Sequence, residues 1–165
     1  MTLASDGQIN AVVPYGVTGN AHVTVQFNGK TADPFPLAVA DSGPGIFTWE
    51  TGPGPAVIVV NGGASVNPKT NPVARGGVVA FWATGQGAVS PGGKDGKAIS
   101  GSKSLMLNSK VTIGGVDAQV TFIGLLYTGV IQVNAVIPAD AAVGDAAVGD
   151  DEVILTMVIR SAERA

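Results

Sequence analysis

The alternation of apolar and polar residues with a period of two is the feature that most constrains how this chain can fold. The segments 22–27 and 35–39 both alternate in this way. This period is typical of half-buried β-strands, and the Asn28-Gly29 pair between the two segments favours a tight hairpin turn. The sequence therefore predicts a β-hairpin over residues 22–39.

The same pattern predicts further strands along the chain. Residues 111–113 run into Gly114-Gly115, which predicts a second hairpin, and alternate apolar residues then follow at Val116, Ala118, Val120 and Phe122. This spacing predicts that these four side chains share one face of the returning strand. Other strands are expected at 46–50, 56–61, 78–84 and 153–159, the last of them apolar on both faces.

Helix signals are weak throughout. The best candidate covers residues 139–150, but Gly144 and Gly149 would each destabilise a helix by about 1 kcal/mol relative to Ala. That stretch is also a direct duplication, AAVGD-AAVGD, which is typical of an elongated loop. With 24 Gly and 10 Pro to supply turns, the chain is predicted to be all-β and to form a sandwich.

One heptapeptide occurs twice, as QINAVVP at residues 8–14 and as QVNAVIP at residues 132–138. In an extended strand its second, fourth and sixth positions share one face, which gives the matched pairs Ile9/Val133, Ala11/Ala135 and Val13/Ile137. Each copy ends at a Pro, which marks the end of a strand. A polar turn and a second alternating strand follow each copy.

The two copies differ in what precedes them. A long β segment leads into the second copy, whereas only seven residues lie before the first. The first copy is therefore predicted to be the back half of a module whose front half is missing. Its exposed edge must be covered by residues 45–60, by a neighbouring chain, or by sequence outside this chain.

Several segments resemble a known family. GGVVAFWATGQG, KVTIGGVDAQVTFIG and IQVNAVIP are similar to the IPT/TIG branch of immunoglobulin-like domains. More closely, the chain resembles an uncharacterised C-terminal domain found in many secreted proteins of Solibacter and related acidobacteria. The matching segments are GQINAVVPYGVTGNAHVTV, GPGIFT, NPVARGGVVAFWATGQGAVSP, DGKA, VTIGGVDAQV and IQVNAVIP, in the family's order.

This resemblance covers most of residues 7–138. The chain departs from the family pattern in a shortened link, LLYTGV, before the second heptapeptide and in the AAVGD duplication after it. The resemblance implies an immunoglobulin-like sandwich in an extracellular or cell-surface protein, and it implies no established activity.

The likeliest domain boundary is the turn-rich region 51–72, which contains TGPGP, NGG and NPKTNP. The expected organisation is an N-terminal partial immunoglobulin-like β unit over residues 1–71, followed by an IPT/TIG-like β-sandwich module over residues 72–165.

Charge and hydropathy exclude several classes of partner. The net charge is −3 and only nine Lys and Arg are present, which argues against a nucleic-acid partner. No apolar run approaches the roughly 20 residues of a transmembrane helix, so membrane insertion is not expected. The leading MTLASDGQ lacks the charged-then-apolar pattern of a signal peptide.

Catalytic patterns are also absent from the sequence. His22 is the single histidine and there is no cysteine, so a zinc site or a Cys nucleophile is not expected. No G-x-S-x-G is present, and the Ser100–Lys103 match to S-x-x-K lies in a predicted loop. We expect His22 to be a solvent-facing strand residue, and we expect neither a cofactor nor an enzymatic activity.

Two groups of residues are weak candidates for a site. Carboxylates are the ligands that calcium prefers, and one segment is dense in them: Asp140, Asp145, Asp150, Asp151 and Glu152. A solvated loop is the alternative for this segment. Aromatic side chains can stack on sugar rings when they are exposed on a flat surface. The candidates are Tyr15, Trp49, Trp82 and Tyr127, and packing in a core or between modules is their alternative role.

The leading functional hypothesis is a non-catalytic structural or interaction module of a secreted or cell-surface protein. Its expected partners are other modules of the parent protein or another protein, and a homodimer through an unpaired N-terminal β edge is a further expectation. The rival hypothesis is a carbohydrate-binding module that recognises polysaccharide through its exposed aromatic residues.

Overall fold

The computed structural model describes residues 3–49, 55–60, 73–99, 101, 104–105, 107–142 and 155–160. Every helix or strand element among them is a β-strand, which confirms the all-β prediction. The strands are β1 Leu3–Ala4, β2 Ile9–Asn10, β3 Asn20–Val23, β4 Gln26–Phe27, β5 Lys30–Thr31, β6 Phe35–Ala38, β7 Gly45–Ile46, β8 Ile58–Val60, β9 Val78–Thr84, β10 Val89–Ser90, β11 Ser104–Leu105, β12 Asn108–Ile113, β13 Val116–Asp117, β14 Val120–Tyr127, β15 Val130–Val136 and β16 Leu155–Arg160. This described part of the chain contains no helix with the length and apolar character needed to cross a bilayer.

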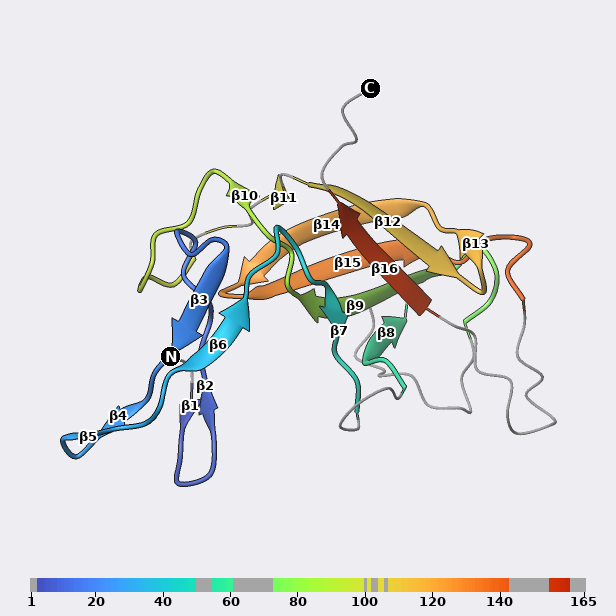
Figure 1. Ribbon diagram of the computed structural model, residues 1–165. Helices are drawn as coiled ribbons and strands as arrows, with labels where there is room; N and C mark the ends of the chain where they lie inside the picture. The colour runs from blue at the N-terminus through green and yellow to red at the C-terminus, as the bar shows by residue number, and fades with distance from the viewer. Residues whose placement is uncertain are drawn as a thin grey trace.

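Two facing sheets form the body of the molecule (Figure 1). The larger has the strand order β14-β15-β9-β7, with β8 also paired to β9, and the smaller has the order β13-β12-β16. All neighbouring strands in both sheets are antiparallel. The strand predicted at 78–84 corresponds to β9, and the second heptapeptide supplies β15 at the centre of the larger sheet.

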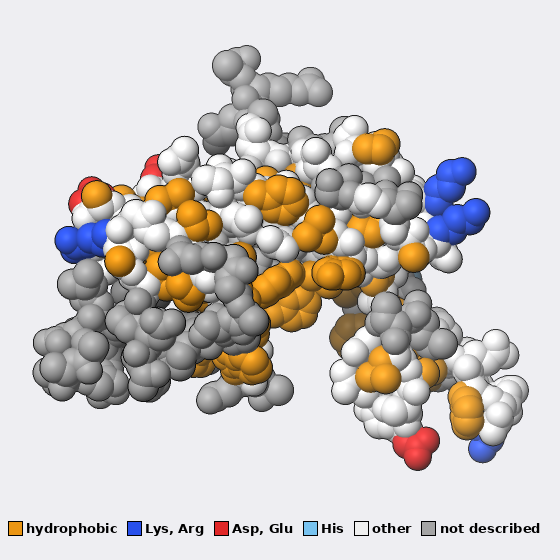
Figure 2. Space-filling model, turned by 180° about the vertical axis from the view of Figure 1, so that it is seen from behind, with side chains coloured by type: hydrophobic (Ala, Val, Ile, Leu, Met, Phe, Trp, Pro, Cys, Tyr) orange, Lys and Arg blue, Asp and Glu red, His pale blue; other side chains and the backbone are white. Residues whose placement is uncertain are grey.

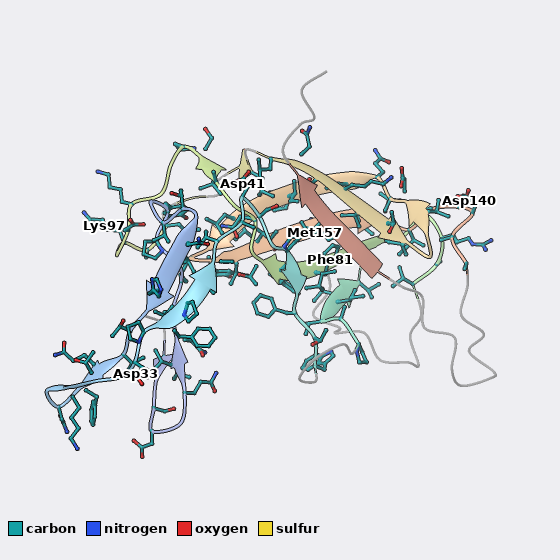
Figure 3. All side chains as sticks on the ribbon, viewed as in Figure 1. Asp33, Asp41, Phe81, Lys97, Asp140 and Met157 are labelled. Carbon is teal, nitrogen blue, oxygen red and sulfur yellow. The ribbon has the colours of Figure 1, made fainter. Side chains whose placement is uncertain are left out.

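The hydrophobic core lies between these two sheets. Phe81 on β9 and Met157 on β16 belong to the same buried cluster and come from opposite layers (Figure 3). Alternate residues of β9 and β15 point into this core, and Phe81, Val133 and Ala135 have no exposed surface. The period of two read from the sequence is therefore the period of burial in these strands.

The returning strand after Gly114-Gly115 differs from the prediction. Val116 lies in the short β13 of the smaller sheet, whereas Val120 and Phe122 lie in β14 of the larger one. Within β14 the register shifts between these last two residues, which pair with the adjacent residues Ala135 and Asn134 of β15. Such a β-bulge reverses the alternation of faces, so the prediction that all four apolar residues share one face is wrong.

Two strands that precede residue 61, β7 and β8, join the larger sheet. β7 pairs with residues 83–84 of β9, and β8 pairs with residues 79–81 of the same strand. Residues 45–60 were one of three alternatives for covering the edge of the N-terminal unit, and the backbone groups of β7 and β8 pair with β9 instead. The larger sheet thus includes two strands from before the predicted boundary at residue 71.

Residues 3–40, called here the N-terminal arm, project away from the two sheets (Figure 1). The arm consists of three short antiparallel pairs, β1-β2, β3-β6 and β4-β5. Asn28 and Gly29 both have positive φ angles at the tip of the last pair, as the predicted tight turn requires. The predicted hairpin over residues 22–39 is confirmed.

Candidate interaction surface

The residue types that carry catalysis or bind metals are not gathered in the described part of the chain, where no three His, Cys, Asp or Glu side chains form a group that could hold a metal ion. His22 lies in β3 and is exposed, as expected. Asp140 is exposed at a turn after β15. The other four calcium candidates, and Ser100 and Lys103, lie outside the described residues.

The four aromatic candidates do not form a single platform. Trp49 follows β7 at one edge of the larger sheet, and Tyr127 ends β14 at the opposite edge. Both are largely exposed, at 60% and 66%. Trp82 is half-buried on the outer face of β9, and Tyr15 lies in the N-terminal arm. This strand order keeps Trp49 and Tyr127 from lying side by side on one sugar-binding surface.

Exposed apolar residues are concentrated in the N-terminal arm. No residue of the arm is buried, and nine of the twelve large apolar side chains that are exposed in the described structure belong to it. The nine are Leu3, Ile9, Val12, Val13, Tyr15, Val23, Val25, Phe27 and Phe35. Figure 2 shows hydrophobic side chains on the projecting lobes of the arm as well as on the outer face of the larger sheet. An exposed apolar surface of this extent is typical of an interaction site.

The arm also has a concave surface on the β3-β6 hairpin. A shallow depression of about 490 Å³ is lined by three residues of each strand: Asn20, Ala21 and His22, with Pro36, Leu37 and Ala38. Asp6, Lys30 and Asp33 are the only charged residues between Leu3 and Ala40. This part of the surface therefore presents apolar and backbone groups with little charge to oppose an apolar partner.

The two heptapeptides have opposite environments. Val133 and Ala135 are fully buried in β15, whereas Ile9 is 49% exposed and Ala11 is exposed. One side-chain hydrogen bond nevertheless occurs in both copies. Gln8 Nε2 donates to Asn10 Oδ1 at 2.7 Å, and Gln132 Nε2 donates to Asn134 Oδ1 at 2.8 Å. The copies thus share this bond but differ in their neighbours and in strand length, because β2 spans only Ile9–Asn10 whereas β15 spans Val130–Val136.

Backbone pairing shows the same contrast. β15 pairs with β14 on one side and β9 on the other, and beyond the strand Ile137 N–H donates to the carbonyl of Gly77 at 2.9 Å. In the first copy only Ile9 and Asn10 pair with β1. Among the described residues, no hydrogen bond joins the backbone of positions 11–13 to another segment. Within the part of the chain that the structure describes, positions 11–13 thus have no paired strand on either edge.

The end of the first heptapeptide is held against the loops of the sandwich. Tyr15 N–H donates to Asp95 Oδ1 at 2.8 Å, and the Tyr15 ring packs on Gly93 so closely that a Cβ there would lie 2.8 Å from the ring oxygen. Val12 packs on Gly129, where a Cβ would lie 2.9 Å from its Cγ2. A side chain at either glycine would force the Tyr15 or Val12 side chain to move, so both positions favour glycine.

The linker after the arm passes just as close to β9. Gly43 N–H donates to the carbonyl of Gly85 at 2.9 Å, and a Cβ at Gly85 would meet the Gly43 backbone, with its carbonyl carbon 2.6 Å away. A Cβ at Gly87 would meet the carbonyl of Asp41, which is labelled in Figure 3. These contacts could not be predicted from local sequence patterns, because each joins segments separated by more than 40 residues.

Comparison of the chain with family models, with curated proteins and with solved structures finds no match.

Proposed function

We propose that the chain is a non-catalytic structural or interaction module of a secreted or cell-surface bacterial protein, and that its N-terminal arm is the contact surface. We further propose that the two-sheet body is an immunoglobulin-like sandwich of the IPT/TIG kind. Three segments support this classification: the Gly-terminated strand in GGVVAFWATGQG, the KVTIGG hairpin and the IQVNAVIP strand. The resemblance to the acidobacterial domain supports it as well.

One observation carries the proposed function: the arm is built of paired strands, yet it buries none of its side chains and exposes nine large apolar ones. A strand pair with an unburied apolar face is marginally stable in water. A second protein surface that covers this face would stabilise it, and main-chain pairing with exposed strands is a common mode of recognition.

Site-specific photo-cross-linking tests this role in the intact protein. p-Benzoylphenylalanine at position 35 replaces an aromatic side chain that is 67% exposed, so the fold should tolerate it. We expect cross-links from this position to protein in the native producing cells. A matched probe at Asp117, whose side chain is 70% exposed on the sandwich, should give none. Equal yields from both positions would contradict the proposal.

Carbohydrate binding remains a second proposal because Trp49 is 60% exposed beside the sheet edge. A titration with soluble polysaccharides, followed by tryptophan fluorescence, tests it. Binding that is lost in Trp49→Ala and kept in Phe35→Ser would favour this function over a protein contact through the arm.

A further inference from the structure

The first heptapeptide has the sequence of a central strand but lacks the neighbours of one. Its twin, β15, lies between β14 and β9 with its alternate residues in the core. β7 and β8, the segments best placed in sequence to cover the arm, are paired with β9 instead. The partner of residues 8–14 is therefore to be sought outside these strands.

The order of elements after each heptapeptide extends the parallel. β15 is followed by β16, which pairs with β12 of the smaller sheet and buries Met157 in the core. Residues 8–14 are followed by the alternating segment 21–27, which overlaps β3. Val23 and Phe27 in that segment are 48% and 74% exposed, whereas Met157 is 7% exposed. In its sequence, the arm thus resembles the last two strands of the sandwich.

From this we propose that the arm completes a second sandwich, whose earlier strands, of the β9-to-β14 kind, belong to a homologous polypeptide segment. In that complex residues 8–14 lie antiparallel between a β9-like and a β14-like strand, one of which replaces β1 beside Ile9 and Asn10, and segment 21–27 closes the facing sheet. The inference rests on the proposed function, because it identifies the partner of the arm.

The neighbours of β15 indicate which residue types the partner strands would place beside the first heptapeptide. On the inner face, a large apolar residue lies beside the second heptapeptide position, as Phe81 lies beside Val133. On the outer face, Gln132 lies between Trp82 and Gly124. The hydrogen bond between the Gln8 and Asn10 side chains is the same as the one between Gln132 and Asn134 on this outer face.

A second copy of this chain is a poorer occupant. Its slot between β14 and β9 is filled by its own β15, which is tethered to β14 through a turn of two residues, Thr128 and Gly129. Such a tether gives β15 a high effective concentration, so a strand from another molecule would not displace it. The partner must be a segment in which this place is open.

Hydrogen exchange in an extended chain tests the inference. Residues 1–7 are replaced by a copy of residues 73–131, so that the first heptapeptide follows a β14-type strand as β15 does. We expect a monomer in which the amides of Ile9 to Val13 exchange at least about 100-fold more slowly than in the wild-type chain. In the matched control, the same extension carrying Ile9→Asn and Val13→Asn, this protection should be lost.

Two results would overturn the inference. In the first, these amides exchange at the wild-type rate in the extended chain. In the second, the wild-type chain is itself a dimer with the same amides protected, which would make a second copy the partner. Cross-links from position 35 to protein would still be seen in either case if the proposed function is right, so the two failures are distinguishable.

A second variant decides the question if the extended chain does not fold. The double substitution Val133→Ile and Ile137→Val changes the sequence of the second heptapeptide into that of the first, at the position of β15 in the full chain. We expect the amides of Ile131 to Ala135 to keep at least a tenth of their wild-type protection. Exchange of these amides as fast as that of Ile9 in the wild-type chain would overturn the inference.

Discussion

The contact between Tyr15 and Gly93 allows the docking of the arm to be tested without disturbing the core. Gly93→Ala would place a Cβ 2.8 Å from the Tyr15 ring oxygen and closer still to two ring carbons. Ordinary contact requires at least 3.4 Å, so the whole ring must move away. Gly92→Ala is the matched control, because nothing lies within 4 Å of a Cβ at that neighbouring position.

The size of the effect follows from what the ring displacement removes. Tyr15 is 37% exposed and its N–H donates to Asp95 Oδ1 at an exposed site, so both interactions are worth less than in a core. A hydrogen bond to a screened carboxylate contributes about 1 kcal/mol, and partial loss of ring packing adds about 0.5 kcal/mol. The total corresponds to roughly a tenfold change in local opening.

The assay is amide hydrogen exchange by NMR on the full chain. In Gly93→Ala we expect the Tyr15 amide to exchange about ten times faster, while the free energy of global unfolding changes by less than about 0.5 kcal/mol. Global stability should be kept because every residue of the core cluster lies at position 79 or later. Equal exchange of the Tyr15 amide in the Gly92 and Gly93 variants would refute the reasoning.

Three further predictions concern stability, each measured by chemical denaturation. Gly85→Ala should lower the free energy of unfolding by roughly 2 kcal/mol or more, because of positive-φ strain and a backbone clash. Gly96→Ala has the same kind of φ and open space around it, so it should lower the free energy of unfolding by only about 1 kcal/mol. Equal losses would contradict the close approach of the linker. Phe81→Ala should destabilise by about 3 to 5 kcal/mol because the side chain is fully buried, and a loss below about 1 kcal/mol would mean that this core is not packed as described. Neutralising the exposed Lys110–Asp117 pair, whose atoms are 2.9 Å apart, should change stability by less than about 0.5 kcal/mol, and a larger change would show that the pair is not solvated.

Local pattern predicted the elements whose determinants are local. The all-β class, the hairpin at Asn28-Gly29 and the strand at 78–84 depend on periodicity and turn chemistry within a few residues, and the structure has them. The split between Val120 and Phe122 was not predictable in this way. Their spacing of two continues through the bulge, and only the register against β15 shows that the alternation reverses there.

Contacts distant in sequence could not be predicted at all. The positions of Gly93 and Gly129 resemble those of any turn glycine, and their role becomes apparent only when Tyr15 and Val12 are found against them. The same holds for residues 45–60, one of three alternatives for covering the edge of the N-terminal unit. In the structure β7 and β8 pair with β9, a strand that lies later in the chain.

The exposed surface of the arm indicates what kind of partner can stabilise it. Ile9 and Val13 are each about half exposed, so burying the remainder of either side chain would contribute about 1 kcal/mol. Even if all nine exposed apolar residues of the arm contributed similarly, the total of roughly 9 kcal/mol would only match the 4 to 15 kcal/mol that free association costs. A partner on the same polypeptide escapes most of that cost because its effective concentration is high. On the proposed function, the arm would therefore bind such a segment more tightly on the same polypeptide than in free solution.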